Sequence, residues 1–210
     1  MKLRDRENML TLGLFLGGTA IVAALALALV SQLTAEPISK ARKENRAKAF
    51  RRLSLPEFDQ LGEPVEVDGV IFYPVKNKAT IVGFIGQGSV AGYGGEIELL
   101  VGFKGDGKIT AVQVLRHKET PGLGANVCDR KFQRTIYNLF AKAPEVPENR
   151  WLDQFNSRDS ADRGKWKISK DGGHLIYLTG ATVTSRAIAG GVDKICAAFC
   201  SGILNGMEKQ

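Results

Sequence analysis

An uncharged run from Met9 to Leu33 constrains this chain more than any other feature of its sequence. A helix of that length, at about 1.5 Å per residue, is longer than the ~30 Å hydrocarbon core of a bilayer. The apolar core of a cleaved signal peptide spans only ~7–15 residues, and a buried helix of a soluble protein is rarely so uniformly apolar. We therefore predict one membrane-spanning helix over residues 9–33, preceded by a short tail at residues 1–8.

Basic residues flank this run, and the whole chain has a formal net charge of +7. They are Lys2, Arg4 and Arg6 before the run and Lys40, Arg42, Lys43, Arg46, Lys48, Arg51 and Arg52 after it. Because they lie beside an apolar helix, contact with lipid head groups is favoured over binding to nucleic acid. The larger number lies after the helix, so the positive-inside rule by itself favours a cytoplasmic location for the rest of the chain.

Residues 34–56 are predicted to form a basic helix or linker beside the membrane. The part from Ser39 to Leu53 has no glycine or proline and is followed by Pro56, so it is expected to continue the apolar helix. Its polar composition is typical of a solvated stalk. The remaining residues, 57–210, are enough for one domain of ordinary size, and the normal apolar content of the chain excludes a disordered protein.

Alternating apolar residues begin near residue 63 and indicate strands. One hairpin is predicted around Asp68-Gly69, where the residue types tolerate positive φ. A third strand is expected at residues 78–87. A second hairpin is predicted around Gly105-Asp106-Gly107.

The second half of the domain is expected to combine helices with a further pair of strands. A helix is predicted over residues 129–142, and a late hairpin around Asp171-Gly172-Gly173. A final helix begins near Thr184, and its expected buried stripe consists of Ile188, Val192, Ile195, Phe199 and Ile203. This order of elements predicts an α+β fold, with one mainly antiparallel sheet and flanking helices behind the transmembrane helix.

The segment Leu178–Arg186 joins the late strand to the last helix and has a composition that suits a phosphate. It reads Leu-Thr-Gly-Ala-Thr-Val-Thr-Ser-Arg, and its small residues allow a large ligand to approach the backbone. Free N–H groups at the start of the helix, together with the cation of Arg186, would stabilise an anion. Serine and threonine before a helix are also common caps, so these residues alone favour capping and leave anion binding as the alternative.

A second segment, His117–Gly124, places hydrogen-bonding side chains in a loop. It reads His-Lys-Glu-Thr-Pro-Gly-Leu-Gly and contains a Thr-Pro-Gly turn signal. The histidine, glutamate and threonine could bind a heterocycle, and Leu123 could cover its face. An ordinary rigid loop after a strand has the same composition, and without other information that interpretation is favoured.

Other kinds of site find little support in the sequence. Two histidines, His117 and His174, are too few for a convincing metal cluster. The three cysteines, Cys128, Cys196 and Cys200, cannot form a complete disulfide framework because their number is odd. Cys196 and Cys200 are four apart in the predicted last helix and are interpreted as small apolar residues. The glycine-rich stretch at residues 86–95 does not open a helix and predicts no Rossmann site, and neither a P-loop nor a nucleophile elbow occurs.

The two loop segments together resemble those of a known family. Thr179-Gly180-Ala181-Thr182, followed by Val-Thr-Ser, resembles the flavinylation motif of FMN-binding subunits. Glu-Thr-Pro-Gly-Leu-Gly at residues 119–124 resembles the flavin-side loop of the same family. Their order behind one N-terminal apolar helix is similar to that in the G subunits of the Rnf ion-translocating oxidoreductases. The C subunits of the sodium-pumping NADH:quinone reductases share these features but are typically longer, and they are the alternative within this resemblance. The resemblance covers essentially the whole chain.

This resemblance implies a cofactor and a set of residues that bind it. FMN would be attached to Thr182 through a phosphoester, installed by a separate flavin transferase. Glu119, Thr120 and Leu123 would lie near the isoalloxazine ring. The phosphate end would be surrounded by Thr179, Gly180, Ala181 and Thr184.

The resemblance also implies a location and partners. The FMN-binding domain at residues 57–210 would lie on the periplasmic side of a bacterial inner membrane, and residues 1–8 would be cytoplasmic, opposite to the orientation that the charges favour. Together with other membrane subunits, the protein would relay electrons between ferredoxin and NAD while the complex moves ions. The chain would thus be part of a translocase and no complete enzyme by itself.

One departure from the family's motif leads to a second hypothesis. The family has an aspartate three residues before the first threonine, where this chain has Ile176. A membrane-anchored scaffold protein without a cofactor is therefore the alternative. A basic nucleic-acid binder is a distant third, because the positive charge flanks the apolar helix and aromatic stacking motifs are missing.

Overall fold

The computed structural model describes residues 2–53, 60–78, 80–131, 147–162 and 165–204. The chain forms two compact units, residues 1–46 and 47–210. Helix α1 (Lys2–Leu53) makes up the first unit and ends in the second. Its apolar part, Thr11–Ala41, has a mean hydropathy of 2.3 and contains no buried residue in its apolar window, so it is long and apolar enough to cross a membrane. The predicted spanning segment at residues 9–33 is therefore helical.

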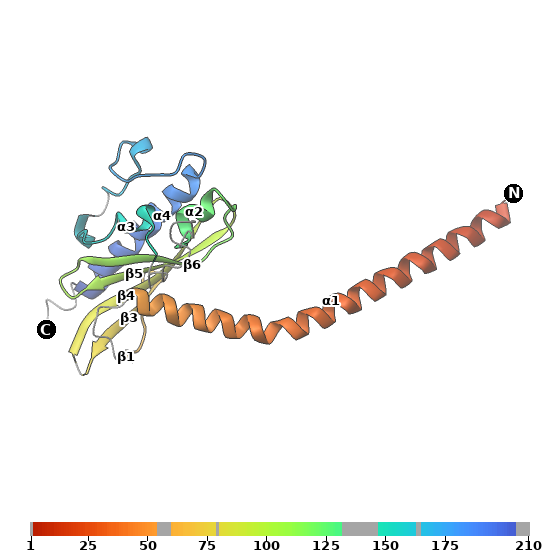
Figure 1. Ribbon diagram of the computed structural model, residues 1–210, viewed down its shortest axis with the longest axis horizontal. Helices are drawn as coiled ribbons and strands as arrows, with labels where there is room; N and C mark the ends of the chain where they lie inside the picture. Colours follow the sequence, from red (N-terminus) through yellow and green to blue (C-terminus); the bar gives the residue numbers. More distant parts are fainter. Residues whose placement is uncertain (1, 54–59, 79, 132–146, 163–164, 205–210) are drawn as a thin grey trace, which may run out of the picture. The chain divides into compact units, whose positions relative to one another are not determined.

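The second unit is built on an antiparallel sheet with the strand order β1-β3-β4-β5-β6, and β2 pairs with the same edge of β3 as β1 (Figure 1). The strands are β1 (Gln60–Leu61), β2 (Val65–Val67), β3 (Val70–Asn77), β4 (Thr80–Ala91), β5 (Glu96–Lys104) and β6 (Ile109–Arg116). All pairings are antiparallel. The predicted sheet type is confirmed, and β4 extends four residues beyond the predicted end at Gln87.

The two early hairpins turn where the sequence predicts. Asp68 and Gly69, between β2 and β3, have φ angles of 51° and 73°. Two consecutive residues with positive φ give a turn whose twist matches that of the strands. Gly107, between β5 and β6, has a φ of 85°.

The prediction of a late hairpin around Asp171-Gly172-Gly173 is wrong. The segment forms a short 3₁₀ helix, η3 (Ser169–Asp171), and Ile168 meets Leu175 in an isolated parallel bridge. The backbone N–H of Ser169 donates to the carbonyl oxygen of Leu175 at 2.8 Å, so the loop closes on itself and pairs no strands. The helix predicted at residues 129–142 lies mostly outside the described residues, and the backbone at Asp129 is extended.

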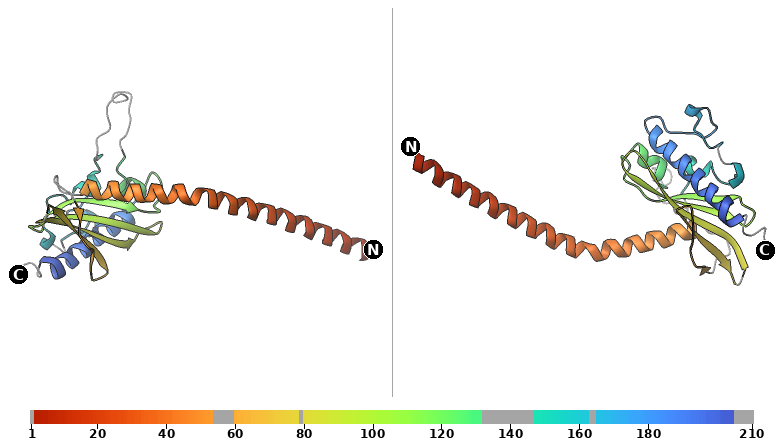
Figure 2. Two further views of the ribbon diagram at one scale, coloured as in Figure 1. Left: turned by 90° about the horizontal axis from the view of Figure 1, so that it is seen from below. Right: turned by 180° about the vertical axis from the view of Figure 1, so that it is seen from behind.

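Helix α4 (Thr182–Ala198) and the π-helical turn that continues it, η4 (Phe199–Leu204), cover one face of the sheet (Figures 1 and 2). The predicted buried stripe is confirmed, with Ile188, Val192, Ile195 and Phe199 buried and Ile203 partly buried against the core. Glycines allow a close approach of helix and sheet. A Cβ atom at Gly86 would lie 2.7 Å from Ile195 Cγ2, and one at Gly191 would lie 2.5 Å from Leu99 Cδ1.

The end of α1 covers the opposite face of the sheet (Figure 2). Its buried residues Ala49, Phe50 and Leu53 pack with Val75, Ile85 and Leu100 of the strands. The Thr110 hydroxyl of β6 donates a hydrogen bond to the carbonyl oxygen of Leu53 at 3.2 Å. The predicted solvated stalk at residues 39–53 is therefore wrong for its last two turns, because the apolar side chains there complete a second core.

Candidate functional site

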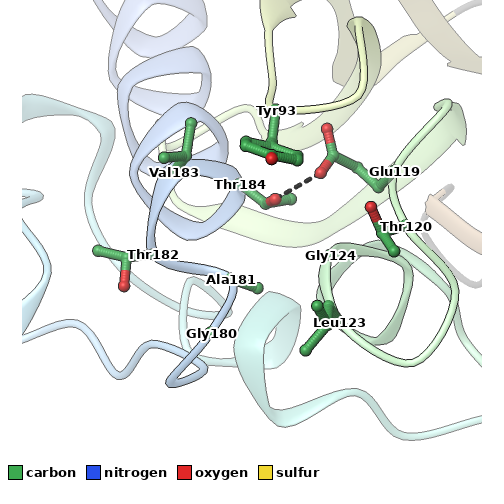
Figure 3. A pocket seen from close by; sticks show the side chains of 10 residues that line it. All are labelled: Tyr93, Glu119, Thr120, Leu123, Gly124, Gly180, Ala181, Thr182, Val183 and Thr184. Atoms are coloured by element: carbon green, nitrogen blue, oxygen red, sulfur yellow. Dashed lines mark hydrogen bonds between the residues drawn. The ribbon is translucent and has the colours of Figure 1, made fainter.

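A cavity of about 480 Å³ lies between the loop after β6 and the start of α4 (Figure 3). Its volume falls within the range of roughly 300–1,000 Å³ that is typical of ligand sites. It is lined by Tyr93, Glu119, Thr120, Leu123, Gly124, Gly180, Ala181, Thr182, Val183 and Thr184. All the predicted FMN-binding residues except Thr179 are among them, so the fold brings the two predicted segments together.

Glu119 connects three parts of the chain around this cavity. Its side chain is buried, and one carboxylate oxygen, Oε2, accepts a hydrogen bond from the Thr184 hydroxyl at 2.5 Å (Figure 3). The other oxygen, Oε1, accepts one from the backbone N–H of Gly94 at 3.0 Å. One carboxylate therefore ties the loop after β6 both to α4 and to the connection between β4 and β5.

Glycines around Glu119 provide the space that its side chain occupies. A Cβ atom at Gly92 or at Gly124 would overlap with an oxygen of the Glu119 carboxylate, and one at Gly124 would also lie 2.7 Å from Thr184 Oγ1. A Cβ atom at Gly94 would overlap with the backbone of Lys118. The stretch at residues 86–95 therefore forms part of the site's wall, although its sequence predicts no binding role.

The start of α4 has backbone N–H groups that can serve a ligand. Ala181, the residue before the helix, has φ −125° and ψ 38°, and no side chain caps the helix there. Ser185 bonds back along the helix, with its N–H and its hydroxyl both donating to the carbonyl oxygen of Ala181 at 3.0 Å. The capping that the residue types favour is thus not formed, which supports the alternative of anion binding.

Thr182 and Gly180 lie at the edge of the cavity. The Thr182 side chain is partly exposed, and Figure 3 shows it directed away from Glu119 and Leu123. Gly180 has a φ of 91°, a conformation that residues with a Cβ rarely adopt, and a Cβ there would lie 3.2 Å from Leu123 Cδ2. The chain therefore turns sharply beside the cavity, and Thr182 lies at its edge without being fully buried.

Arg186 is engaged elsewhere. Its guanidinium forms two hydrogen bonds of 2.7 Å with the carboxylate of Asp171, and it does not line the cavity. The hydrogen bond from Arg186 keeps the pKa of Asp171 below its usual value. The expected contribution of Arg186 to an anion site is therefore directed to Asp171 instead.

Exposed apolar side chains border the cavity and complete its lining. Tyr93 is 73% exposed, Val183 47% and Leu123 45%. Tyr93, Gly124 and Val183 line the cavity but are absent from the predicted set. Tyr93 could not be predicted, because only the fold brings the β4–β5 connection beside α4. Apolar walls with a few polar groups are typical of sites for organic cofactors. Among the described residues, no group of three potential metal ligands occurs.

Comparison with known proteins agrees with this geometry. Residues 92–197 match the model of the FMN-binding domain family, and this range contains both predicted segments. Over 216 residues the chain is 32% identical to the G subunit of the ion-translocating oxidoreductase complex of Pseudomonas aeruginosa, in an alignment that covers 95% of this chain and 92% of that protein.

Two further relatives are also G subunits of such complexes. The first belongs to the ion-translocating oxidoreductase complex of Stutzerimonas stutzeri, at 32% identity over 197 residues, or 89% of this chain and 79% of that protein. The second belongs to the Na⁺-translocating ferredoxin:NAD⁺ oxidoreductase complex of Acetobacterium woodii, at 30% identity over 207 residues and 90% of both proteins.

Proposed function

Because the chain belongs to the family of FMN-binding G subunits of ion-translocating oxidoreductase complexes, we propose that it relays electrons through FMN attached covalently to Thr182. The observation that carries this proposal is the cavity in which residues 119–124 meet residues 180–184. It places a threonine hydroxyl, uncapped helix N–H groups and apolar walls around one space. The protein is a membrane flavoprotein subunit, and the covalent phosphoester is the proposed mode of attachment.

The residues of the cavity suit the two ends of FMN. The hydroxyl of Thr182 would form the ester, and the N–H groups at the start of α4 would bind phosphate oxygens. Gly180 and Ala181 leave the backbone accessible because they have little or no side chain. Leu123 and Tyr93 provide apolar surface for the ring system, while Thr120 offers a hydroxyl to its polar edge. FMN supplies the redox chemistry, and the protein supplies binding, orientation and electrostatic environment.

We further propose the arrangement of the protein in its complex. Residues 9–33 of α1 would cross the inner membrane once, the basic residues that follow would lie close to lipid head groups, and the FMN-binding domain would face the periplasm. This domain would exchange electrons with other membrane subunits, and the complex as a whole would transfer electrons between ferredoxin and NAD. A covalent ester suits this location because it prevents loss of the cofactor outside the cytoplasm.

Attachment can be tested on the full chain produced together with a flavin transferase. We expect in-gel flavin fluorescence after denaturing electrophoresis and a mass increase of one FMN on the peptide that contains Thr182. Thr182→Val should abolish both signals, because valine has the same shape but no hydroxyl. Thr80→Val, which changes an exposed threonine at the start of β4, should retain both.

Two results would contradict the proposal. One is fluorescence that survives Thr182→Val, which would place the bond elsewhere. The other is native protein of bare polypeptide mass, which would support the scaffold hypothesis that Ile176 motivates.

A further inference from the structure

His117 lies two positions before Glu119 in the loop after β6 and does not line the cavity. Its ring nitrogen Nδ1 accepts a hydrogen bond from the backbone N–H of Glu119 at 3.1 Å, and Nε2 lies 2.8 Å from Asp129 Oδ1. A backbone N–H can only donate, so Nδ1 has to be the unprotonated nitrogen, and Nε2 donates its proton to the carboxylate. The two contacts together describe a neutral imidazole. The expected contact of His117 with a heterocycle is replaced by this supporting role.

We propose that neutral His117 is a positioning residue for the FMN-binding cavity and that its protonation loosens the cavity by releasing Glu119. A proton added to Nδ1 would point at the N–H of Glu119, so the hydrogen bond between them would be lost. The carboxylate of the same residue holds Thr184 and Gly94. A shift of the Glu119 backbone is therefore transmitted to the start of α4 and to the connection that carries Tyr93. The link to FMN rests on the proposed function.

The charged groups next to His117 have opposite signs. Asp129 places a negative charge beside Nε2 of His117, and the ammonium group of Lys131 lies 2.7 Å from the other oxygen of Asp129. Burial disfavours the charged form of Asp129, but hydrogen bonds from Lys131 and His117 outweigh it, so the pKa of Asp129 lies below its usual value. Asp129 therefore stays an anionic acceptor throughout the range in which an imidazole titrates.

Glu119, Arg116 and Cys128 are further titratable groups within two positions of His117 or Asp129 in the chain. The carboxylate of Glu119 adds negative charge on the same loop. Burial raises the pKa of the Cys128 thiol, at the end of α2 (Gly124–Cys128), to about 12, so this group is neutral. Arg116, at the end of β6, lies within 3.6 Å of Glu96 and Glu98 on β5.

Three substitutions separate the two hydrogen bonds of His117. In His117→Asn, the amide oxygen can take the place of Nδ1 and accept from Glu119, but the side chain does not titrate. In His117→Gln, the longer side chain can donate to Asp129, but it puts no acceptor where Nδ1 was. Asp129→Asn keeps an acceptor oxygen for Nε2 and removes the negative charge.

The test uses the full chain in detergent, with and without attached FMN, titrated between about pH 5 and pH 8. The chain has only two histidines, so ¹⁵N-histidine labelling gives resolved imidazole signals, with His174 as the internal reference. We expect flavin fluorescence to change in one transition whose midpoint coincides with titration of His117. In the FMN-free chain, uniformly labelled with ¹⁵N, the amide signals of Gly94 and Thr184 should shift with the same midpoint.

The variants predict distinct outcomes. His117→Asn should remove the transition, Asp129→Asn should move its midpoint to lower pH because the negative charge beside Nε2 is lost, and His117→Gln should resemble the acid form at every pH. A transition that persists in His117→Asn, or a proton found on Nδ1 at pH 8, would overturn the proposal. Failure of FMN attachment would leave the measurements on the FMN-free chain unaffected, so the two proposals can fail separately.

Discussion

Glu119 shows how one buried side chain organises a site made from distant residues. Burying a carboxylate is unfavourable unless hydrogen bonds replace those to water. Here the Thr184 hydroxyl and the Gly94 N–H supply them, and they come from two other segments of the chain. Because the buried carboxylate of Glu119 requires these hydrogen bonds, it fixes the relative positions of the segments that form the cavity.

The three cysteines differ from one another in burial, and burial sets their expected reactivity. Burial raises the pKa of Cys128 to about 12 and that of Cys196 further above its ordinary value of 9.0. Cys200 is only partly buried. Because the thiolate is the reactive form, Cys200 should be alkylated first in the native chain, and the other two only after denaturation. Mass spectrometry should count one label before denaturation and three after it. Rapid native labelling of Cys128 would contradict the prediction.

The raised pKa of the two buried thiols also predicts the effect of alkaline pH. The folded state holds the thiol protons more tightly than the unfolded state does, so their contribution to stability is complete below about pH 9 and declines as the pH rises above it.

At the scale of elements, the contact of α4 with the sheet depends on glycines, which have no side chain at the points of closest approach. Gly86 and Gly88 on β4 lie under Ile195, and Gly191 on the helix lies against Leu99 and Val90. Small residues at a helix–sheet contact allow the backbones to approach closely, and the core side chains then fill the space beside them. The helix start that borders the cavity is held in place by this contact.

Two adjacent glycines of α4 provide a matched test. A Cβ atom at Gly191 would lie 2.5 Å from Leu99 Cδ1 and 2.8 Å from Val90 Cγ1, whereas one at Gly190 meets nothing within 4 Å. Gly191→Ala should destabilise the domain by about 1–3 kcal/mol through overpacking. Gly190→Ala should stabilise it by up to about 1 kcal/mol, because alanine favours the helix. Denaturant unfolding of both full-length variants measures the difference, and equal effects would refute the explanation.

At the scale of the whole molecule, α1 has two roles. Its apolar part can cross a membrane, and its last turns cover one face of the sheet with Ala49, Phe50 and Leu53. The ring centroid of Phe50 lies 5.2 Å from that of Tyr73 in an edge-to-face contact. The same helix therefore belongs to the membrane anchor at one end and to the core of the domain at the other.

Shortened chains should separate these roles. A chain that begins at Ala47 should leave the membrane fraction and keep its fold, because it retains the residues that bury Val75, Ile85 and Leu100. A chain that begins at Gln60 should be less stable by several kcal/mol, since each large apolar side chain contributes about 1.5–3 kcal/mol when buried. Phe50→Ala in the longer of the two chains should fall between them in denaturant unfolding. Equal unfolding midpoints for all three would show that the end of α1 does not stabilise the domain.

The sequence by itself determined the local features of this protein. An uncharged, mostly apolar run indicates the helix at 9–33, and alternation with Asp68-Gly69 and Gly105–Gly107 indicates the hairpins. These patterns are local: the backbone conformation of a segment decides which of its side chains share a face, and residues near each other in the chain determine that conformation. Resemblance of the segments at 119–124 and 179–182 to known motifs pointed to the site, although spacing alone favoured an ordinary loop and a cap.

Only the tertiary structure decided how those parts meet. Glu119 and Thr184 are 65 positions apart, and no periodicity predicts that their side chains share a hydrogen bond. The same holds for Tyr93 beside the cavity and for the end of α1 against the sheet. The physical reason is that burial and hydrogen bonding are satisfied between segments distant in sequence. Whether a polar side chain caps a helix, binds a ligand or supports a neighbour therefore depends on which segment folds against it.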